Sequence, residues 1–445
     1  LFGKERKIPL NRLSQCMIVK NEETNIRRAL SWAAGIAEEQ IVVDTGSTDR
    51  TVEIAREMGA KVYSFSWTDD FSAAKNFAIS KASGQWIAFL DADEYLSEED
   101  AQKLPGLLKQ LSPGRTDGIM TAWVQLDSQG NVTSNGTQVR LFPNRKDLSY
   151  QRRIHEQLAR EDGKTLRMTD ATQSLAVIHT GYASADDMKG RKFERNIRLI
   201  KRELEDHPED YEMLGYLGDV YCGAEQWDHA EASYQKAVGL MPPVLKAGDQ
   251  RSAATFLKLI QILDLKHAPE EQILSLYQDA MSREELKKDA DFDYLMARWY
   301  LKRKDYQEAL SYLLQTLKKL ETYGTFGRAM YASAGLQEIY EQTAVCQKAV
   351  GNYKEAVSQS VAVLQADPWS MTALWVLFES FHCGGVSSSQ ADLFLDKIYD
   401  KTSLKTRIFL LRSAGKADWP ELEVLFRSRL SPEELACFKR SMEKN

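Results

Sequence analysis

The sequence predicts an α/β domain followed by an all-helical repeat domain. Over the first hundred residues, short apolar runs alternate with helical patterns, which is typical of a parallel sheet with right-handed crossovers. Past residue 185 nearly every segment has helical periodicity, and one pattern recurs there. The 445 residues are also too many for one ordinary core. We therefore expect an α/β domain at 1–185, helical repeats at 186–384 and a helical cap at 385–445.

Seven strands are expected in the first domain. The four that predict a parallel sheet cover residues 14–19, 40–44, 61–65 and 85–90. Helices are expected between them over residues 21–34, 50–58 and 71–83. Three further strands of a mixed sheet are expected over 118–124, 137–142 and 174–179. Ligands of such sheets bind beyond the carboxyl ends of the strands, where Asp44 and Asp91 lie.

The helical half contains a repeat of about 34 residues built from two antiparallel helices. One match is complete, at Leu217, Gly218, Tyr221, Ala230, Tyr234, Ala237 and Pro242. Weaker matches lie at Met296, Ala297, Tyr300, Ala309 and Leu313, and at Ala344, Ala356, Val363 and Pro368. Small residues let paired helices approach and large ones fill the seam. The pattern predicts tetratricopeptide-like repeats, with a degenerate copy over 244–281.

Composition excludes several classes of partner and compartment. The net charge of −6 gives no reason to expect a nucleic acid. No run approaches the roughly 18 apolar residues of a membrane helix, and the charged first residues have no apolar core behind them. We therefore expect neither an integral membrane protein nor a signal peptide. The five cysteines are scattered and form no Cys-x-x-Cys pair, which favours a reducing cytoplasm.

Two carboxylates follow directly on the apolar run that ends at Leu90. Asp91 and Asp93 have the spacing at which one side chain can hold a divalent ion and the other a ribose or a metal-bound water. Mn²⁺ or Mg²⁺ held there could neutralise a diphosphate leaving group. The alternative is a solvated loop before a helix that Ser97 caps.

Asp44 also ends an expected strand and is followed by a tight turn. Gly46 permits that turn, and the Asp44 carboxylate could accept a hydrogen bond from the N–H of a base. The alternative is a plain helix cap, which Thr48 or Asp49 could supply instead.

Four motifs together resemble the family 2 glycosyltransferases. They are IVKNEE at 18–23, VDTGSTDRT at 43–51, FSAAKN at 71–76 and FLDADE at 89–94. The resemblance implies a GT-A fold, a nucleoside-diphosphate sugar donor such as a UDP-sugar, a divalent metal ion, and inversion at the anomeric carbon.

The resemblance also implies roles for single residues. Asp44 would contact a uracil-like base, Asp91 the ribose and Asp93 the metal ion. Lys75 stands where the family often has Arg, near the base and the phosphates. The full expected donor set is Ile18, Lys20, Asn21, Glu22, Asp44, Ser47, Lys75, Asp91, Ala92 and Arg140. For Arg140, steadying the diphosphate and forming a surface salt bridge are both open.

Three shorter motifs narrow the resemblance to a bacterial subgroup. RLF at 140–142, RIHE at 153–156 and IHTGY at 178–182, followed by repeats, are similar to peptide S-glycosyltransferases of the sublancin type. This resemblance implies a peptide acceptor modified on a side chain.

An inverting transfer needs a general base, and Glu156 is the first candidate, with His155 as the second. The alternative for Glu156 is an ion pair with Arg152 or Arg153. A zinc-protease interpretation of this stretch fails because Ala159 replaces the required second histidine.

The expected metal ligands are Asp93, Asp91 and His179. For His179, which ends a strand, metal ligation and a hydrogen bond to a backbone carbonyl are both open.

Three functions remain open on the sequence. The leading one is hexose transfer from a UDP-sugar to a Cys, Ser or Thr side chain of a peptide or protein, held in the groove of the repeats. The second is the same chemistry on a lipid-linked or cell-surface glycan, and the third is a non-catalytic repeat scaffold. The repeats could also mediate self-association into a homo-oligomer.

Overall fold

The computed structural model describes residues 12–180, 186–246, 249–325 and 328–442. The chain divides into two compact units, one ending at Ala230 and one beginning at Glu231. The last strand ends at His179, and the helices that fill the rest of the chain begin at Asp186. The predicted fold class, an α/β domain followed by helices, is confirmed. The boundaries predicted at 185 and 384 follow the change of pattern rather than contacts, and stay predictions.

The strands of the described residues all lie in the first unit. They are β1 Leu13–Val19, β2 Glu39–Asp44, β3 Lys61–Ser64, β4 Trp86–Phe89, β5 Glu94–Leu96, β6 Gly118–Leu126, β7 Val132–Pro143, β8 Leu148–Gln151, β9 Gln157–Arg160, β10 Met168–Asp170 and β11 Ala176–His179. Within the described ranges nine of them form one mixed sheet in the order β3-β2-β1-β4-β7-β6-β11-β5, with β10 beside β6. Strands β3, β2, β1 and β4 run parallel, β7 is antiparallel to β4, and β8 and β9 form a separate hairpin.

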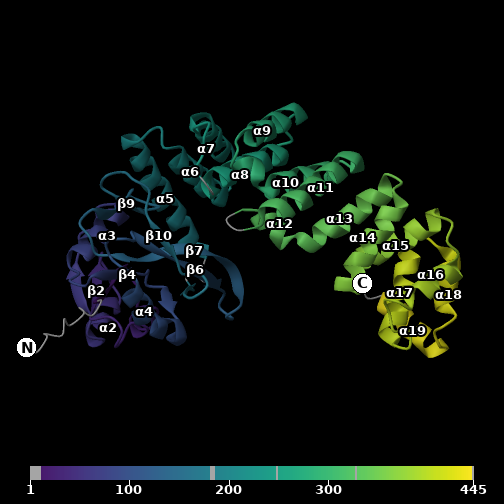
Figure 1. Cartoon of the computed structure of the whole chain (residues 1–445), viewed down its shortest axis with the longest axis horizontal. Helices are drawn as coiled ribbons and strands as arrows, with labels where there is room; N and C mark the ends of the chain where they lie inside the picture. The colour runs from purple at the N-terminus through teal and green to yellow at the C-terminus, as the bar shows by residue number, and fades with distance from the viewer. Residues whose placement is uncertain (1–11, 181–185, 247–248, 326–327, 443–445) are drawn as a thin grey trace, which may run out of the picture. The chain divides into compact units, whose positions relative to one another are not determined.

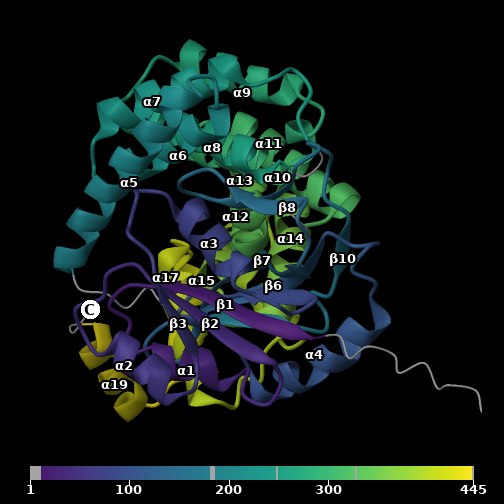
Figure 2. The ribbon, with the colours of Figure 1, turned by 90° about the vertical axis from the view of Figure 1, so that its left-hand side faces the viewer.

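Helices cover both faces of the parallel strands. They are α1 Ile26–Ser31, α2 Thr51–Glu57, α3 Phe71–Ser80 and α4 Glu98–Gln110. Met17 and Val19 of β1 pack against α1 and α2, while Cys16, which precedes Met17 and points to the opposite face, packs toward Ala78 of α3. Figure 2 shows α1 and α2 on one side of these strands and α3 on the other. Strands β1, β2 and β4 are buried on both faces, which is why they appear as apolar runs in the sequence, whereas the edge strand β3 is partly exposed.

Caps fix where the two helices next to the site begin. The Asp70 carboxylate accepts a hydrogen bond from the Ala73 N–H at 2.8 Å and starts α3. Ser97 does the same for the Asp100 N–H at 3.1 Å and starts α4. The helix cap predicted at Ser97 is therefore present, and it does not use Asp91 or Asp93.

The start of the first helix was predicted wrongly. Residues 21–25 are not helical, and α1 begins only at Ile26. Asn21 has a left-handed backbone (φ 58°), which an Asn side chain tolerates, and its side-chain oxygen accepts from the Thr48 N–H at 2.8 Å. The strands β5, β8, β9 and β10 were not predicted, because three or four residues are too few to show a period of two.

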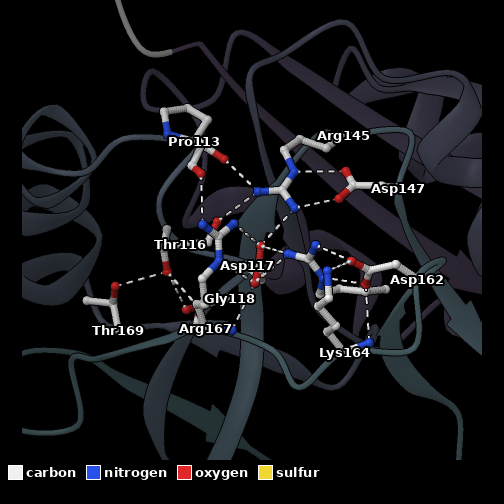
Figure 3. A network of polar contacts seen from close by, with 12 residues as sticks. Pro113, Thr116, Asp117, Gly118, Arg145, Asp147, Asp162, Lys164, Arg167 and Thr169 are labelled. Atoms are coloured by element: carbon white, nitrogen blue, oxygen red, sulfur yellow. Dashed lines mark hydrogen bonds and ion pairs between the residues drawn. The ribbon is translucent and has the colours of Figure 1, made fainter.

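One buried carboxylate fixes the base of the β8–β9 hairpin. Asp117 is fully buried and forms ion pairs with Arg145 (2.7 Å), Arg160 (3.3 Å) and Arg167 (2.7 Å) (Figure 3). These guanidinium groups hold the pKa of Asp117 well below its usual range, against the opposing effect of burial. Because Arg145 precedes β8 and Arg160 ends β9, a single side chain holds both ends of the hairpin.

The remaining elements are helices (Figure 1). They are α5 Asp186–Asp206, α6 Tyr211–Gly223, α7 Trp227–Leu240, α8 Gln250–Leu265, α9 Glu270–Ser282, the short 3-10 helix Leu286–Lys288, α10 Ala290–Lys302, α11 Tyr306–Tyr323, α12 Met330–Ala334, α13 Leu336–Ala349, α14 Tyr353–Ala366, α15 Met371–Cys383, α16 Ser388–Leu395, α17 Leu404–Lys416, α18 Pro420–Arg427 and α19 Pro432–Met442. No helix within the described ranges combines the length and apolar character that crossing a membrane requires.

The three predicted repeat matches fall on the helix pairs α6–α7, α10–α11 and α13–α14. Their small residues are fully buried, for example Ala230, Ala309 and Ala356, and so is the large Tyr234. The segment predicted as a degenerate copy contains the pair α8 and α9. For α10–α11 and α13–α14, which pack together within the second unit, small residues at the seam allow the close helix pairing that the sequence predicted.

We expect Asp117→Ala to destabilise the first unit by about 3–5 kcal/mol, because three guanidinium groups lose a shared buried partner. Urea unfolding, followed by hydrogen exchange at β6 and the β8–β9 hairpin, measures the change. Asp162→Ala is the matched control, since its carboxylate is exposed and pairs with Arg160 at the surface; it should destabilise the unit far less than Asp117→Ala does. Equal losses in the two variants would contradict the anchoring role.

Candidate active site

The carboxyl ends of three parallel strands bring the predicted motifs to one edge of the sheet. β1 lies between β2 and β4, so Val19 pairs with Asp44 on one side and Cys16 pairs with Phe89 on the other. Asp91 and Asp93 follow β4 directly. Residues that are far apart in the sequence therefore meet where ligands of parallel sheets bind.

The ends of β1 and β2 are tied together by side chains of the expected donor set. Asp44 accepts from the Ser47 N–H at 3.0 Å, which closes the turn at Gly46 (φ 109°). The Asn21 N–H donates to Ser47 Oγ at 2.9 Å, so the two strand ends are cross-linked. Ile18 is half-buried and Lys20 is exposed at the end of β1. The turn is thus built by Asp44, Ser47 and Asn21, all of which belong to the expected donor set.

Lys75 of α3 is a buried cation between two carboxylates. Its side chain is 2% exposed, and its ammonium lies 2.6 Å from Glu156 Oε1 and 3.4 Å from Asp91 Oδ1. The rings of Phe89 and Tyr150, which pack against each other, lie beside it, each with its centroid 5.1 Å from the nitrogen. The two carboxylates raise the pKa of Lys75 above its usual range although burial acts to lower it. Lys75 therefore stays charged and joins α3, the end of β4 and the loop after β8.

Arg140 of β7 holds the other side of Asp91. Its guanidinium lies 3.2 Å from Asp91 Oδ2 and 2.7 Å from Glu94 Oε1. Glu94 is fully buried, accepts from the Asp91 N–H at 3.0 Å and also accepts from Trp123 Nε1 at 2.9 Å. Arg140 is 14% exposed, so its ion pairs are not the surface salt bridge that the sequence left open.

The charge state of Asp91 follows from these contacts. Burial acts to raise the pKa of this carboxyl, but the ammonium of Lys75 and the guanidinium of Arg140 outweigh it and lower the pKa to about 2. Asp91 is therefore ionised throughout the neutral range, with each oxygen engaged by a different cation.

Asp93 and His179 form a second pair on the same edge. Asp93 Oδ2 lies 3.2 Å from His179 Nε2, and the His179 ring lies 4.9 Å from that of Trp123. An oxygen and an imidazole nitrogen at this separation fit two ligands of one divalent ion. Across the described residues no cluster of three or more metal-binding side chains is gathered. An ion held by this pair would complete its shell with water and phosphate oxygens, as Mg²⁺ commonly does.

Negative charge accumulates around this pair. Burial raises the pKa of the Glu22 carboxyl, and the charges of Asp93, Asp49 and Asp91 raise it further, against a hydrogen bond from Asn25 that lowers it. Such mutual repulsion among carboxylates is relieved when a cation binds. The electrostatics of this edge therefore favour a divalent ion.

The loop between β8 and β9 carries both candidate bases. Glu156 reaches Lys75, whereas the His155 ring stacks on Tyr216 of α6 with centroids 3.7 Å apart. Neither Arg152 nor Arg153 forms the alternative ion pair with Glu156. Arg152 pairs with Asp210 and Glu212, and Arg153 with Glu203 and Asp206.

Several residues of the site were not predicted. Glu94, Trp123, Tyr150, Glu203 and Tyr216 contact the expected residues, yet none was selected from the sequence. Glu94 was the only one with a usable signal, since it directly follows the Asp91-Ala92-Asp93 motif. Gly181 and Tyr182 of the third short motif lie outside the described residues.

Comparison with known proteins decides the family of this domain. Residues 14–178 match the model of glycosyl transferase family 2. The first domain is a family 2 glycosyltransferase domain. The resemblance read from the four motifs is thereby confirmed, and Asp44, Lys75, Asp91, Asp93, Arg140 and Glu156 all lie within the matched residues.

Two curated relatives each match slightly less than half of this chain. A TPR repeat-containing protein of Synechococcus elongatus is 35% identical over 213 residues, which are 47% of this chain and 52% of that protein. The SPbeta prophage-derived glycosyltransferase SunS of Bacillus subtilis is 28% identical over 204 residues, 45% of this chain and 47% of that protein. The chain thus spans about half the length of the curated relatives it matches.

Solved structures give weaker similarity. S. aureus TarS 1-349 in complex with UDP-GlcNAc is 13% identical and covers 58% of this chain and 93% of that chain, with a TM-score of 0.36.

Proposed function

We propose that this chain is an inverting, metal-dependent glycosyltransferase that moves a hexose from a UDP-sugar to a Cys, Ser or Thr side chain of a peptide or protein. The observation that carries the proposal is the arrangement of Asp91 and Asp93 at the carboxyl edge of a family 2 domain, with Asp91 fixed by Lys75 and Arg140. A strand end with two oriented carboxylates suits a ribose and a metal-bound diphosphate.

The donor would lie along the ends of β1, β2 and β4. Asp44, Ile18 and Lys20 would receive the base, with Asn21, Glu22, Ser47 and Ala92 around them. Asp93 and His179 would hold Mn²⁺ or Mg²⁺, which when bound neutralises charge on the departing UDP. We assign Lys75 and Arg140 to holding Asp91 rather than to the phosphates, because both cations are buried against carboxylates.

The acceptor would lose its proton to Glu156, with His155 as the second candidate. The acceptor sulfur or oxygen attacks the anomeric carbon from the side opposite UDP, its proton passes to Glu156, and the bond to the UDP oxygen breaks with the electron pair leaving on UDP. Glu156 is favoured because it lies beside Lys75, which also contacts Asp91, so the base and the donor side share one support. His155 is instead stacked on Tyr216.

A peptide or protein acceptor is supported by the repeats that follow the domain and by the three shorter motifs at 140–142, 153–156 and 178–182. A cytoplasmic location, the absence of a nucleic-acid partner and self-association through the repeats stay predictions from the sequence.

Incubation with UDP-glucose or UDP-N-acetylglucosamine and Mn²⁺ should release UDP even without an acceptor, and chelation with EDTA should stop it. Asp93→Asn should lower the release at least about 100-fold, because the ion loses its carboxylate ligand. Asp170→Ala, an exposed aspartate on β10, is the control and should match the unchanged protein. Equal UDP release by Asp93→Asn would remove the argument for a metal at this site.

Glu156→Gln should slow transfer to an acceptor by about 100-fold or more, since a positioned base contributes 10²–10⁴-fold, while the Kd for UDP measured by calorimetry changes little. His155→Gln should slow transfer by less than about tenfold. The reverse ranking of the two variants would make His155 the base.

Reaction with candidate peptides that contain Cys, Ser or Thr should add one hexose mass, located by fragmentation in a mass spectrometer. Lipid and cell-wall extracts, treated in parallel with radiolabelled donor, should stay unlabelled. Labelling of an extract with no mass gain on any peptide would favour the glycan acceptor instead.

A further inference from the structure

The loop that carries the candidate bases has an unfavourable backbone. Between β8 and β9, Arg152 has φ 73° and His155 has φ 53°, both in the left-handed region that side chains disfavour. Asp69, which precedes α3 and faces the same region, has φ 58°. Conformations of this kind persist only where surrounding contacts fix them, and they gather at functional sites. The contacts that fix this loop therefore bear on its function.

Helix α5 supplies one of these contacts through a buried carboxylate. Glu203 is 4% exposed, and its Oε2 accepts from the Arg153 N–H at 2.9 Å and lies 3.3 Å from the Arg153 guanidinium. Asp206, one turn further on, pairs with the same guanidinium at 2.7 Å. Glu203 thus holds both the main chain and the side chain of one residue in the loop.

Helix α6 and its N-terminal cap hold the neighbouring positions. The Arg152 guanidinium lies 3.0 Å from Asp210 and 2.7 Å from Glu212. His155 stacks on Tyr216 with an interplanar angle of 7°. All of these partners lie beyond residue 178, where the match to the family model ends.

Helix α3 holds the loop from the other side. Ser72 Oγ donates to the Arg152 carbonyl at 2.5 Å and the Phe71 N–H donates to the Arg153 carbonyl at 2.8 Å. Lys75 then holds Glu156 at 2.6 Å. The α5–α6 pair is itself bonded to the start of α3, since Arg198 pairs with Asp69 at 2.8 Å. The loop is therefore clamped between α3 of the catalytic domain and the first helix pair after it.

We propose that the first helix pair, α5 and α6, is part of the catalytic centre, with Glu203 as the positioning residue that sets the Arg152–Glu156 loop and so places Glu156. The inference rests on the proposed function. Because a displacement of about 1 Å at a reacting group can cost about 100-fold in rate, loosening the loop would impair proton transfer while leaving the donor side intact. The donor side is built from the ends of β1, β2 and β4, which Glu203 does not contact.

The test compares Glu203→Ala, Glu203→Gln and the control Glu205→Ala in the full chain. Glu205 is exposed on the same helix two positions on. Glu203→Ala should lower kcat for transfer at least about tenfold with the KM for the UDP-sugar within about threefold of the unchanged protein. Glu203→Gln keeps an oxygen that can accept from the Arg153 N–H, so it should restore most of kcat. Glu205→Ala should not change either constant.

A second measurement follows the loop without relying on activity. Trypsin cleaves after Arg152 and Arg153 only when the loop opens, so Glu203→Ala should raise cleavage there about tenfold and Glu203→Gln should raise it less. The sites are identified by mass spectrometry, and circular dichroism confirms that each variant is folded.

Three outcomes would overturn the inference. The first is unchanged kcat in a folded Glu203→Ala variant. The second is a fall in kcat with a parallel rise in KM that Glu203→Gln does not rescue, which indicates general damage. The third is unchanged cleavage after Arg152 and Arg153. If the unchanged protein transfers no sugar at all, the proposed function fails, and the cleavage rates alone then decide whether α5 holds the loop.

Discussion

The site depends on one buried cation, the ammonium of Lys75. A charged lysine with a side chain 2% exposed is stable only if it is paired, and its partners come from two different parts of the domain. Asp91 follows β4, where the donor would bind, and Glu156 lies in the β8–β9 loop, where the acceptor would be deprotonated. The need to neutralise Lys75 therefore fixes the distance between these two halves of the site, and the adjacent rings of Phe89 and Tyr150 shield the ammonium from water.

Two cations, Lys75 and Arg140, give the two aspartates of the motif, Asp91 and Asp93, different surroundings. Lys75 and Arg140 engage both oxygens of Asp91, whose pKa they lower to about 2. Asp93 has no such cation and faces His179 instead. An ionised Asp91 held by two cations and an Asp93 that faces an imidazole suit a site in which one carboxylate orients a ribose and the other joins a metal ion. The remaining negative charge, felt by Glu22, supplies the attraction for that ion.

The strands and motifs of the first domain could be predicted because they depend on local pattern. β1, β2 and β4 are apolar runs, and Asp44 and Asp91 follow them directly. The partners of the site could not be predicted, because they depend on long-range pairing. Arg152 and Arg153 were reasonable partners for Glu156 by proximity in the sequence, but their backbone turns the side chains toward α5 and α6. The helix predicted to begin at Asn21 begins later for a related reason. The left-handed backbone of Asn21 interrupts the helix, but the amino-acid composition of the segment does not reveal it.

The boundary at which the sequence pattern changes from strands to helices differs from the boundary of the first compact unit. Pattern marks the place where strands give way to helices, between His179 and Asp186, whereas the first compact unit continues to Ala230. The difference consists of α5 and α6, whose carboxylates Glu203 and Glu212 are buried against arginines of the β8–β9 loop. Buried ion pairs are costly to separate, because each leaves an unpaired charge. The strained loop that carries the candidate base of the catalytic domain therefore also holds the first helix pair to that domain.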